Sequence, residues 1–320
     1  MGKSITLSII FQAESLNYGE GFANFSELKK LSRMNGNYYS IATRQSLGYD
    51  IRRLGKEMFN WDLDTIRRID GKSGTLQFKP ECTIKESVEM DLFGYMKTKP
   101  STKNRKNTDE AASTDKENVE TDKTSTRSAI ARVSNAISLE PYRGDTDFLN
   151  NKGFADRVGE HPNIANIENH YSFYTYTVTI DLDKVGEDNN ISLSNEEKAK
   201  RVNELLDIIK VLNRHIRGRF ESLAPLFVIG GIYPIANPFF LGRLTLDTQH
   251  NNFILNLNSI TDVLETTIFD CSIKNNTAVG INSSTFYNEE QIKTELPNVS
   301  IVEEFFRNLK NEVNSYYKVL

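Results

Sequence analysis

The chain has 320 residues and a formal net charge of −4, and 38% of its residues are hydrophobic and 26% charged. This composition is typical of a globular protein, and the length allows one large domain or two small ones. A generic nucleic-acid binder is usually basic overall, so the net charge argues mildly against that class. Two distant cysteines exclude a disulfide framework and favour a reducing, cytoplasmic location, and no apolar run reaches membrane-spanning length. The four histidines lack the spacing of metal ligands, so we expect neither a metal site nor a cofactor.

The first part of the chain predicts a strand, a polar loop and a short helix. Apolar and polar residues alternate at the start, as in a strand. The apolar positions are Ile5, Leu7, Ile9 and Phe11. A polar loop with glycines follows at residues 15 to 21, and Ser26 is predicted to cap a short basic helix. The basic residues of that helix are Lys29, Lys30 and Arg33.

The stretch of residues 38 to 56 predicts an amphipathic helix with a basic front, which would begin after Thr43. Its buried stripe would be Leu47, Ile51, Leu54 and Met58, and its opposite face Gln45, Tyr49, Arg52 and Lys56. Thr43 can cap the helix, which places Arg44 beside free backbone N–H groups. Residues 28 to 56 hold seven Lys or Arg residues and one acid, a local excess of +6. On periodicity alone, a surface helix with a solvated polar face is the simpler explanation.

The next segments are mixed in character. Residues 69 to 75 predict a turn between two short strands, because Ile66 stands where a phosphate loop needs a glycine. Residues 89 to 96 predict a packed helix or strand. Residues 97 to 128 are polar and lack aromatic residues, so we expect a flexible surface insertion. Its basic first part could touch a polyanion, although solvated loop charge explains it more simply.

The middle of the chain predicts two ordered segments around a long loop. Residues 129 to 138 predict a strand or a tight structural segment, and residues 139 to 169 a loop without sustained periodicity. Residues 171 to 182 form the clearest predicted strand. Its core face would be Tyr174, Tyr176, Val178, Ile180 and Leu182, and its other face Tyr171, Phe173, Thr175, Thr177 and Thr179. The two aromatic residues of the second face could stack on bases or pack against a neighbouring strand.

A long helix is predicted to begin at the capping box of Ser194 and Glu197. We expect it to end in the basic residues 214 to 219, where cations stabilise the helix dipole. Its buried stripe would be Val202, Leu205, Leu206, Ile209, Leu212 and Ile216.

The last part of the chain predicts strand, glycine loop and strand over residues 225 to 246, and the pair Gly230 and Gly231 would let a backbone approach closely. A short strand at residues 252 to 257 and a helical turn at residues 260 to 264 follow. The final helix is predicted to begin at Ser300 and to pack on the sheet. Its apolar line would be Ile301, Phe305, Leu309 and Val313.

Several separated motifs occur in an order that resembles the crRNA-binding backbone subunit of type I CRISPR Cascade, the seventh Cas family of the RAMP superfamily. The motifs are S-L-N-Y-G-E-G, Y-Y-S-I-A-T-R-Q-S-L-G-Y-D-I-R-R, D-L-F-G-Y-M, A-R-V-S-N-A-I-S-L-E-P-Y-R-G-D-T-D-F and H-Y-S-F-Y-T-Y-T-V-T-I-D-L. Within that family the chain resembles the DevR branch of subtype I-B systems. The resemblance covers most of residues 1 to 246.

The resemblance implies an α+β fold with a modified RNA-recognition (RRM, ferredoxin-like) palm and with fingers and thumb insertions. The palm would comprise residues 1 to 56, 129 to 138 and 170 to 320, the fingers residues 57 to 128 with the flexible polar segment at 97 to 128, and the thumb loop residues 139 to 169.

The resemblance also implies a subunit without catalytic activity that polymerises along the crRNA. Each thumb would fold over the guide and kink one nucleotide out of its helix. The guide would be gripped by its phosphates, independent of sequence, and presented for pairing with target DNA in antiviral defence. The implied partners are crRNA, target DNA through the guide, further copies of the chain, and the crRNA-processing, large and PAM-recognising subunits of Cascade.

The resemblance and the basic helix together give a set of expected RNA-binding residues. They are Asn17, Tyr18, Gly19, Tyr39, Arg44, Gln45, Ser46, Tyr49, Arg52, Arg53, Gly230 and Gly231. In the thumb, the expected residues are Tyr142, Arg143, Phe148, Phe154 and Ile164, of which the last three could be wedges against bases or the thumb's own small core. Relatives carry Lys or Arg where this chain has Gly48, so Arg44, Arg52 and Arg53 are the candidate replacements.

Two other functions compete with the backbone role. Related type III backbone proteins cut target RNA with a loop aspartate and a metal ion, and Asp145 or Asp147 could act in this way. One or two acids in a loop are more often caps or turn formers. A developmental regulator that acts alone is suggested by the branch name only.

Overall fold

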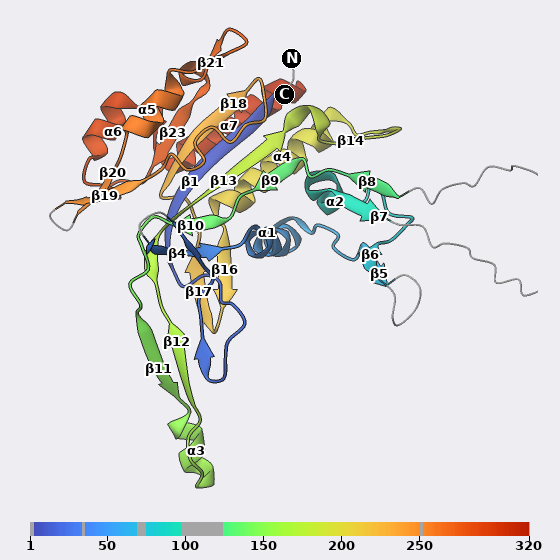
Figure 1. Cartoon of the computed structure of the whole chain (residues 1–320). Coiled ribbons are helices and arrows are strands. Elements are labelled where there is room, and N and C mark those ends of the chain that lie inside the picture. Colours follow the sequence, from blue (N-terminus) through green and yellow to red (C-terminus); the bar gives the residue numbers. More distant parts are fainter. Residues whose placement is uncertain (1–2, 34–35, 69–74, 98–123, 250–251, 320) are drawn as a thin grey trace, which may run out of the picture.

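A computed structural model describes residues 3–33, 36–68, 75–97, 124–249 and 252–319 of the chain. These residues form a mixed α+β fold around one large sheet, and a long hairpin projects from the body of the protein (Figure 1). The predicted α+β class is confirmed. Among the described residues, no helix is long and apolar enough to span a membrane. Both cysteines are free.

The large sheet contains nine strands. Their order is β24 (Val299–Ser300), β23 (Ala278–Ile281), β18 (Phe227–Tyr233), β1 (Ser4–Glu14), β13 (Tyr171–Asp181), β10 (Ala136–Ser138), β4 (Tyr38–Ala42) and β3 (Lys30–Ser32). The ninth strand, β9 (Ala131–Val133), lies beside β10 in the chain and also pairs with β13.

β1 and β13 form the centre of this sheet. They pair in antiparallel register from Ser4 opposite Asp181 to Glu14 opposite Tyr171. β18 pairs with the other edge of β1. Alternate side chains of both strands enter one core, as their sequence pattern predicts, and Tyr174 and Tyr176 lie fully buried there.

Both faces of the sheet are covered. One face packs against α1 (Arg44–Phe59), α4 (Asn195–Lys210) and α7 (Val302–Tyr317). The other face carries a second core, to which residues 239 to 296 contribute. The second face of β13 is therefore largely buried, because Phe173, Thr177 and Thr179 are each less than 10% exposed. Of the two alternatives for its aromatic residues, Phe173 packs inside the protein, whereas Tyr171 is 64% exposed.

The C-terminal third also contains several short elements. They are β19 (Leu246–Gln249), β20 (Asn252–Leu255), α5 (Asn258–Leu264), β21 (Thr267–Ile268), β22 (Cys271–Ser272), α6 (Glu289–Glu295) and a 3-10 turn at Lys274–Asn276, and another 3-10 turn, Leu182–Lys184, follows β13. β20 and α5 confirm the short strand and the helical turn predicted there.

The predicted helix starts are confirmed at two helices. The side-chain oxygen of Thr43 accepts a hydrogen bond from the N–H of Ser46, and that of Ser194 accepts one from Glu197 at 3.3 Å. The ends of the helices are less well predicted. Met58 is 41% exposed, because the chain turns after α1 and places Trp61 in the core. Ile301 precedes α7 and is 58% exposed, so it lies outside the apolar line of that helix.

Two predicted helical segments are strands. Ser26 ends β2 (Phe25–Ser26), which pairs with β12, and the basic segment after it forms β3, which pairs with the next strand, β4. The long helix α4 stops at Lys210, and residues 213 to 222 form the hairpin of β16 (Asn213–Ile216) and β17 (Arg219–Ser222). Arg217 at its tip has φ of 48°, so the chain reverses where the sequence suggested a helix end.

The predicted glycine loop is also wrong, because Gly230 and Gly231 lie inside β18. A Cβ atom at Gly230 would stand 1.9 Å from the carbonyl oxygen of Thr6, and one at Gly231 1.9 Å from that of Asn276. The glycines therefore allow close approach, and the backbone they approach is the protein's own.

Residues 139 to 169 are more regular than the sequence indicates. They form β11 (Thr146–Asn150), α3 (Lys152–Val158) and β12 (Ile164–Glu168), and the two strands pair as a hairpin with α3 at its tip (Figure 1). β2 pairs with β12 in parallel and extends the hairpin to three strands. The regularity was hidden because every residue from 143 to 150 is exposed, which removes the apolar alternation of a strand.

Residues 57 to 128 hold several short elements beside α1. β5 (Ile66–Arg68) pairs with β6 (Leu76–Phe78), which confirms the two predicted short strands. α2 (Val88–Phe93) and β7 (Tyr95–Lys97) occupy the predicted packed segment. β7 pairs with β8 (Ser125–Arg127), so order begins before Ser128. The predicted turn between β5 and β6 and most of the predicted flexible segment lie outside the described residues.

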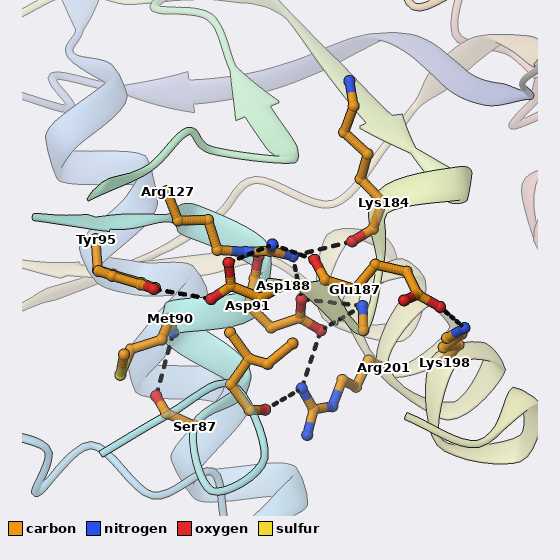
Figure 2. A network of polar contacts seen from close by, with 12 residues as sticks. Ser87, Met90, Asp91, Tyr95, Arg127, Lys184, Glu187, Asp188, Lys198 and Arg201 are labelled. Carbon is orange, nitrogen blue, oxygen red and sulfur yellow. Dashed lines mark hydrogen bonds and ion pairs between the residues drawn. The ribbon is translucent and has the colours of Figure 1, made fainter. Parts of the chain in front are cut away.

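The carboxylate of Asp91, on α2, joins this region to the rest of the protein (Figure 2). It is fully buried and lies 2.6 Å from Arg127 and 2.9 Å from Arg201. It also accepts hydrogen bonds from the backbone N–H of Gly186, which lies in the turn before the small hairpin of β14 (Glu187–Asp188) and β15 (Ile191–Ser192). One side chain thus ties α2, β8 and α4 together.

We predict that Asp91→Asn destabilises the protein by about 3 kcal/mol, because it leaves two buried guanidinium groups without their shared anion. Urea unfolding measures the change. Asp64→Asn is the control, because Asp64 is 91% exposed and its ion pair with Lys79, at 3.6 Å, lies in solvent. An exposed pair contributes little to stability, so this variant should leave the unfolding midpoint unchanged. Equal stability of the two variants would contradict the structural role of Asp91.

Candidate nucleic-acid interface

The front of α1 presents Arg44 to solvent. Its backbone N–H donates to the side-chain oxygen of Asn135 at 2.8 Å, and within the described residues its guanidinium makes no hydrogen bond or ion pair. Gln45 and Lys56 are exposed, and Tyr49 is 67% exposed. The predicted polar front is confirmed in geometry, and Arg44 is free to meet an anion there.

Relatives carry a cation at the position of Gly48, and in this chain the guanidinium of Arg52 lies beside that glycine. Its guanidinium donates to the carbonyl oxygen of Gly48 at 2.9 Å, pairs with Glu89 and lies 4.4 Å from the ring centre of Phe93. A Cβ atom at residue 48 would stand 2.8 Å from this guanidinium, so the glycine makes room for it. Arg52 remains at the surface, but Glu89 neutralises much of its charge.

Arg53 holds elements of the protein together. Its guanidinium donates to Asn213 in β16 at 2.6 and 2.9 Å and pairs with Glu57 at 2.9 Å. Asp50, 2% exposed, lies between Arg53 and Arg214. Burial raises the pKa of Asp50 above its ordinary value, and the two guanidinium groups oppose that shift. These contacts occupy Arg53, so it is poorly placed to bind a phosphate.

Arg44 and Arg52 line a depression of about 420 Å³ between α1 and the segment around β9. Its remaining lining residues are Gln45, Gly48, Phe93, Ala129, Ala131, Arg132 and Val133. Arg132 is exposed and, within the described residues, has no ion pair. The sequence prediction missed Arg132, although its outward position on a strand beside buried Ala131 was a signal. The lining holds three arginines and no acid, which suits a phosphate.

The first loop, residues 15 to 21, lies against the start of α1. The side-chain amide of Asn17 donates to the hydroxyl of Thr43 at 3.1 Å, and Asn17 is 9% exposed, so it supports the loop more than it meets solvent. The hydroxyl of Tyr18 donates to the carbonyl oxygen of Glu168 at 3.2 Å, and Arg217 lies 4.1 Å above the Tyr18 ring. Ser46 is half-buried beside Asn17, and Gly19 is exposed.

Several cations around the first loop, α1 and the hairpin root carry no ion pair among the described residues. They are Lys29, Arg33, Arg44, Arg132, Arg143 and Arg217. Arg33 lies 5.5 Å from the ring centre of Tyr39, one of the predicted residues. Lys29 and Arg217 were not predicted as site residues, because Lys29 was assigned to a helix and Arg217 to a helix end.

The root of the hairpin is fixed by the carboxylate of Glu168. Both of its oxygens lie 2.6 Å from the ammonium group of Lys30, and one accepts the backbone N–H of Leu28 at 2.7 Å. The Lys30 ammonium group lies 4.7 Å from the ring centre of Tyr142, which is half-buried. These contacts hold both ends of the hairpin against β3, so its direction is set by the sheet.

The remaining predicted residues of the hairpin are exposed. Phe148 is 56% exposed, Phe154 67% and Ile164 48%, so they form no closed core of their own. Arg143 is exposed at the root. The predicted RNA contact at Gly230 and Gly231 has no support from the structure, because close backbone packing around β18 accounts for both glycines.

Comparison with known proteins identifies the fold and the family. The family described as "CRISPR-associated negative auto-regulator DevR/Csa2" matches residues 5–239. No curated protein matches the chain in sequence. A chain of a "CRISPR RNA-guided surveillance complex, pre-nicking" has a TM-score of 0.55 at 10% identity, covering 97% of this chain and 100% of that one. A chain of a "CRISPR RNA-guided surveillance complex" has a TM-score of 0.54 at 12% identity, covering 98% and 99%. At these identities the likeness shows a shared fold.

We predict that His170, at the hairpin root, makes the protein less stable at acid pH. Burial lowers its pKa below the ordinary value, and the weaker fields of Glu140 and Asp145 oppose the shift. The unfolded chain therefore takes up a proton at about pH 6.5 while the folded protein does not, so stability falls as pH drops below that value. Above it, both states are neutral and the contribution is constant.

Urea unfolding between pH 5 and pH 8 tests this expectation. Wild type should lose stability with falling pH more steeply than His170→Asn, whose amide oxygen can replace the ring nitrogen 2.7 Å from the Ser40 hydroxyl. The exposed His161 gives the control, since His161→Asn should follow wild type. Parallel curves for wild type and His170→Asn would refute the prediction.

Proposed function

The chain belongs to the DevR/Csa2 family of CRISPR-associated proteins, and we propose that it is a backbone subunit of a type I CRISPR surveillance complex (Cascade) that binds the crRNA guide. The observation that carries the proposal is the group of cations around α1, the first loop and the hairpin root that have no ion pair in the described part of the chain, on a protein with net charge −4. Free positive charge around these elements of an acidic protein favours a polyanionic ligand.

The proposed binding is to phosphates and is independent of sequence. Arg44, Arg132 and Arg217 end in guanidinium groups, which pair well with phosphate oxygens. The positive end of the α1 dipole adds a favourable field for an anion nearby. Such contacts position a strand without reading its bases, so that any spacer sequence is accepted.

The division into palm, fingers and thumb belongs to the same proposal. The large sheet draws its strands from the proposed palm, residues 1 to 56, 129 to 138 and 170 to 320. Residues 57 to 128 are the proposed fingers, and the projecting hairpin within residues 139 to 169 is the proposed thumb (Figure 1). The proposed palm is a modified RRM-like unit, supported by its antiparallel centre and the helices on one face.

We further propose that copies of the chain polymerise along one crRNA in the cytoplasm, with each thumb folded over the guide. The guide is then presented to target DNA, and the other Cascade subunits, which process crRNA, recognise the PAM and complete the complex, join the filament. The subunit itself is proposed to be non-catalytic. Among the described residues, no three His, Cys, Asp or Glu side chains are grouped to hold a metal ion, so cleavage by Asp145 or Asp147 has no supporting observation.

The direct test is to purify the full chain from cells that transcribe a CRISPR array and to sequence the nucleic acid that copurifies. We expect crRNA with periodic protection from ribonuclease, because each copy covers a fixed length of guide. Cleavage of complementary RNA in magnesium, lost in Asp145→Ala or Asp147→Ala, would favour the nuclease alternative. A stable monomer free of RNA would favour a regulator that acts alone.

We predict that Arg44→Ala combined with Arg132→Ala weakens binding to all guide sequences alike. Each single-strand phosphate contact contributes about 0.7 to the slope of log K against log salt concentration, so the slope should fall by about 1.4 when both contacts are lost. Fluorescence anisotropy over a salt series measures it. Arg307→Ala with Lys318→Ala removes the same charge from α7 and its end, and should leave the slope unchanged. An unchanged slope in the first variant would refute the phosphate assignment.

A further inference from the structure

The hairpin of β21 and β22 ends in a turn of two residues, Phe269 and Asp270, because Ile268 pairs directly with Cys271. Both turn residues have positive φ angles, 48° and 63°. Two-residue hairpin turns of this kind favour Asn and Gly, which adopt the left-handed conformation easily. A bulky side chain is rare in that conformation. The turn therefore holds a phenylalanine at a position where the backbone disfavours one.

Packing within the chain does not explain this phenylalanine. The Phe269 ring is 57% exposed, and Asp270 beside it is exposed and has no ion pair in the described part of the chain. A disfavoured conformation that displays a large aromatic ring indicates a partner outside the chain. Residues 244 to 304 contain nine Asp or Glu and two Lys, a net charge of −7, which disfavours a nucleic acid here. The hairpin tip thus suits an apolar depression of a protein, with a cation beside it.

A depression of about 340 Å³ beside the C-terminal half of α1 has these properties. Tyr49 and Ile66 in its lining are 67% and 44% exposed, so an inserted ring covers apolar surface there. Lys56 is exposed and, among the described residues, has no ion pair. The remaining lining residues are Leu63 and two ion pairs, Arg52 with Glu89 and Arg53 with Glu57. Lys56 is therefore the charge left for a partner.

We infer that the hairpin tip of one copy docks in this depression of a second copy, with Phe269 in the apolar part and Asp270 paired with Lys56. The hairpin packs on one face of the large sheet and α1 on the other (Figure 1), so one chain cannot bring the two together. A contact between two unlike surfaces repeats from copy to copy and builds an open filament. The inference rests on the proposed function and names the contact between its copies.

The depression leaves the strongest candidate phosphate contacts free. Arg44 lines the neighbouring depression together with Arg132, and Arg52 is common to both linings. The guide and the hairpin of the next copy can therefore lie side by side along α1. In this arrangement Tyr49, which the sequence assigned to RNA, contacts the neighbouring copy.

Other pairings of exposed rings and depressions fit less well. Arg157 lies 5.4 Å from the ring centre of Phe154 on α3, so that ring would bring a second cation to Lys56. A depression of similar size beside Tyr95 includes Asp188 in its lining, which would repel Asp270. Charge therefore favours the tip of β21 and β22 with the depression on α1.

Charge reversal tests the contact in the full chain bound to a guide RNA long enough for several copies. Asp270→Lys and Lys56→Glu should each raise the protein concentration needed for multi-copy complexes about ten-fold or more, because like charges then face each other. The combined variant restores opposite charges and should assemble like wild type. Sedimentation velocity measures the complexes. Asp262→Lys reverses an exposed acid of the same layer and should have no effect.

A second variant separates docking from folding. Phe269→Gly removes the ring and gives the turn a residue that adopts positive φ freely, so the urea midpoint should not fall. Assembly should still weaken about ten-fold or more, since the aromatic anchor is lost. Binding of one copy to a short RNA should stay at the wild-type level. A variant that assembles like wild type would overturn the inference.

Photo-crosslinking identifies the occupant of the depression. With p-benzoylphenylalanine at position 269, we expect crosslinks to peptides of α1 or β5 in another copy. The same group at Tyr287, 73% exposed in the same layer, should not give them.

The contrary outcomes are distinct. Crosslinks from position 269 only to another subunit, or no rescue by the combined charge reversal, would overturn the inference and leave RNA binding standing. Wild type that binds no RNA would overturn the proposed function, and crosslinks between its copies would then still support the contact.

Discussion

The register of β1 against β13 determines where the candidate interface lies. Because Glu14 is opposite Tyr171, the first loop leaves the sheet at the point where the hairpin of β11 and β12 returns to it. Ser15 seals this junction: its N–H donates to the carbonyl oxygen of His170 at 3.0 Å, and its hydroxyl accepts the N–H of His170 at 2.9 Å. A slip of one residue would turn every side chain of the strand to the other face and expose the core. The hydrophobic pattern of two strands thus places the loop and the thumb side by side.

Local chemistry explains which parts of the structure were predictable. Thr43 and Ser194 begin helices because a hydroxyl cap depends only on residues a few positions away. The segment around Ser26 was mistaken for a helix because β2 pairs with β12, far along the chain, and β3 forms a hairpin with the next strand, β4. The sequence left open whether Phe173 stacks on bases or packs inside the protein, because the residues that cover it come from the C-terminal third. Sequence patterns indicate well which residues are buried, but they do not indicate which distant segment covers those residues.

The same distinction applies to the basic front of α1. The sequence shows that Arg44, Arg52 and Arg53 lie near one another, and this is correct. It does not show that Glu89 approaches Arg52 from α2, or that Asn213 receives Arg53 from β16. Two of the three charged side chains therefore attach α1 to neighbouring elements. Much of the predicted basic surface thus serves contacts within the protein. Free charge lies instead on scattered residues of the first loop, β9 and the thumb root.

Under the proposed function, this distribution of charge sets how tightly one copy would hold RNA. With Arg52 and Arg53 occupied, a single protomer would meet the guide through a small number of phosphates, and its contact with a short strand would be weak and quickly reversed. In the proposed filament, copies side by side on one strand would rebind at the high effective concentration set by their neighbours, so avidity would grow with every repeat. Such a filament would select guides by length, because guides long enough for many copies would be retained and fragments released.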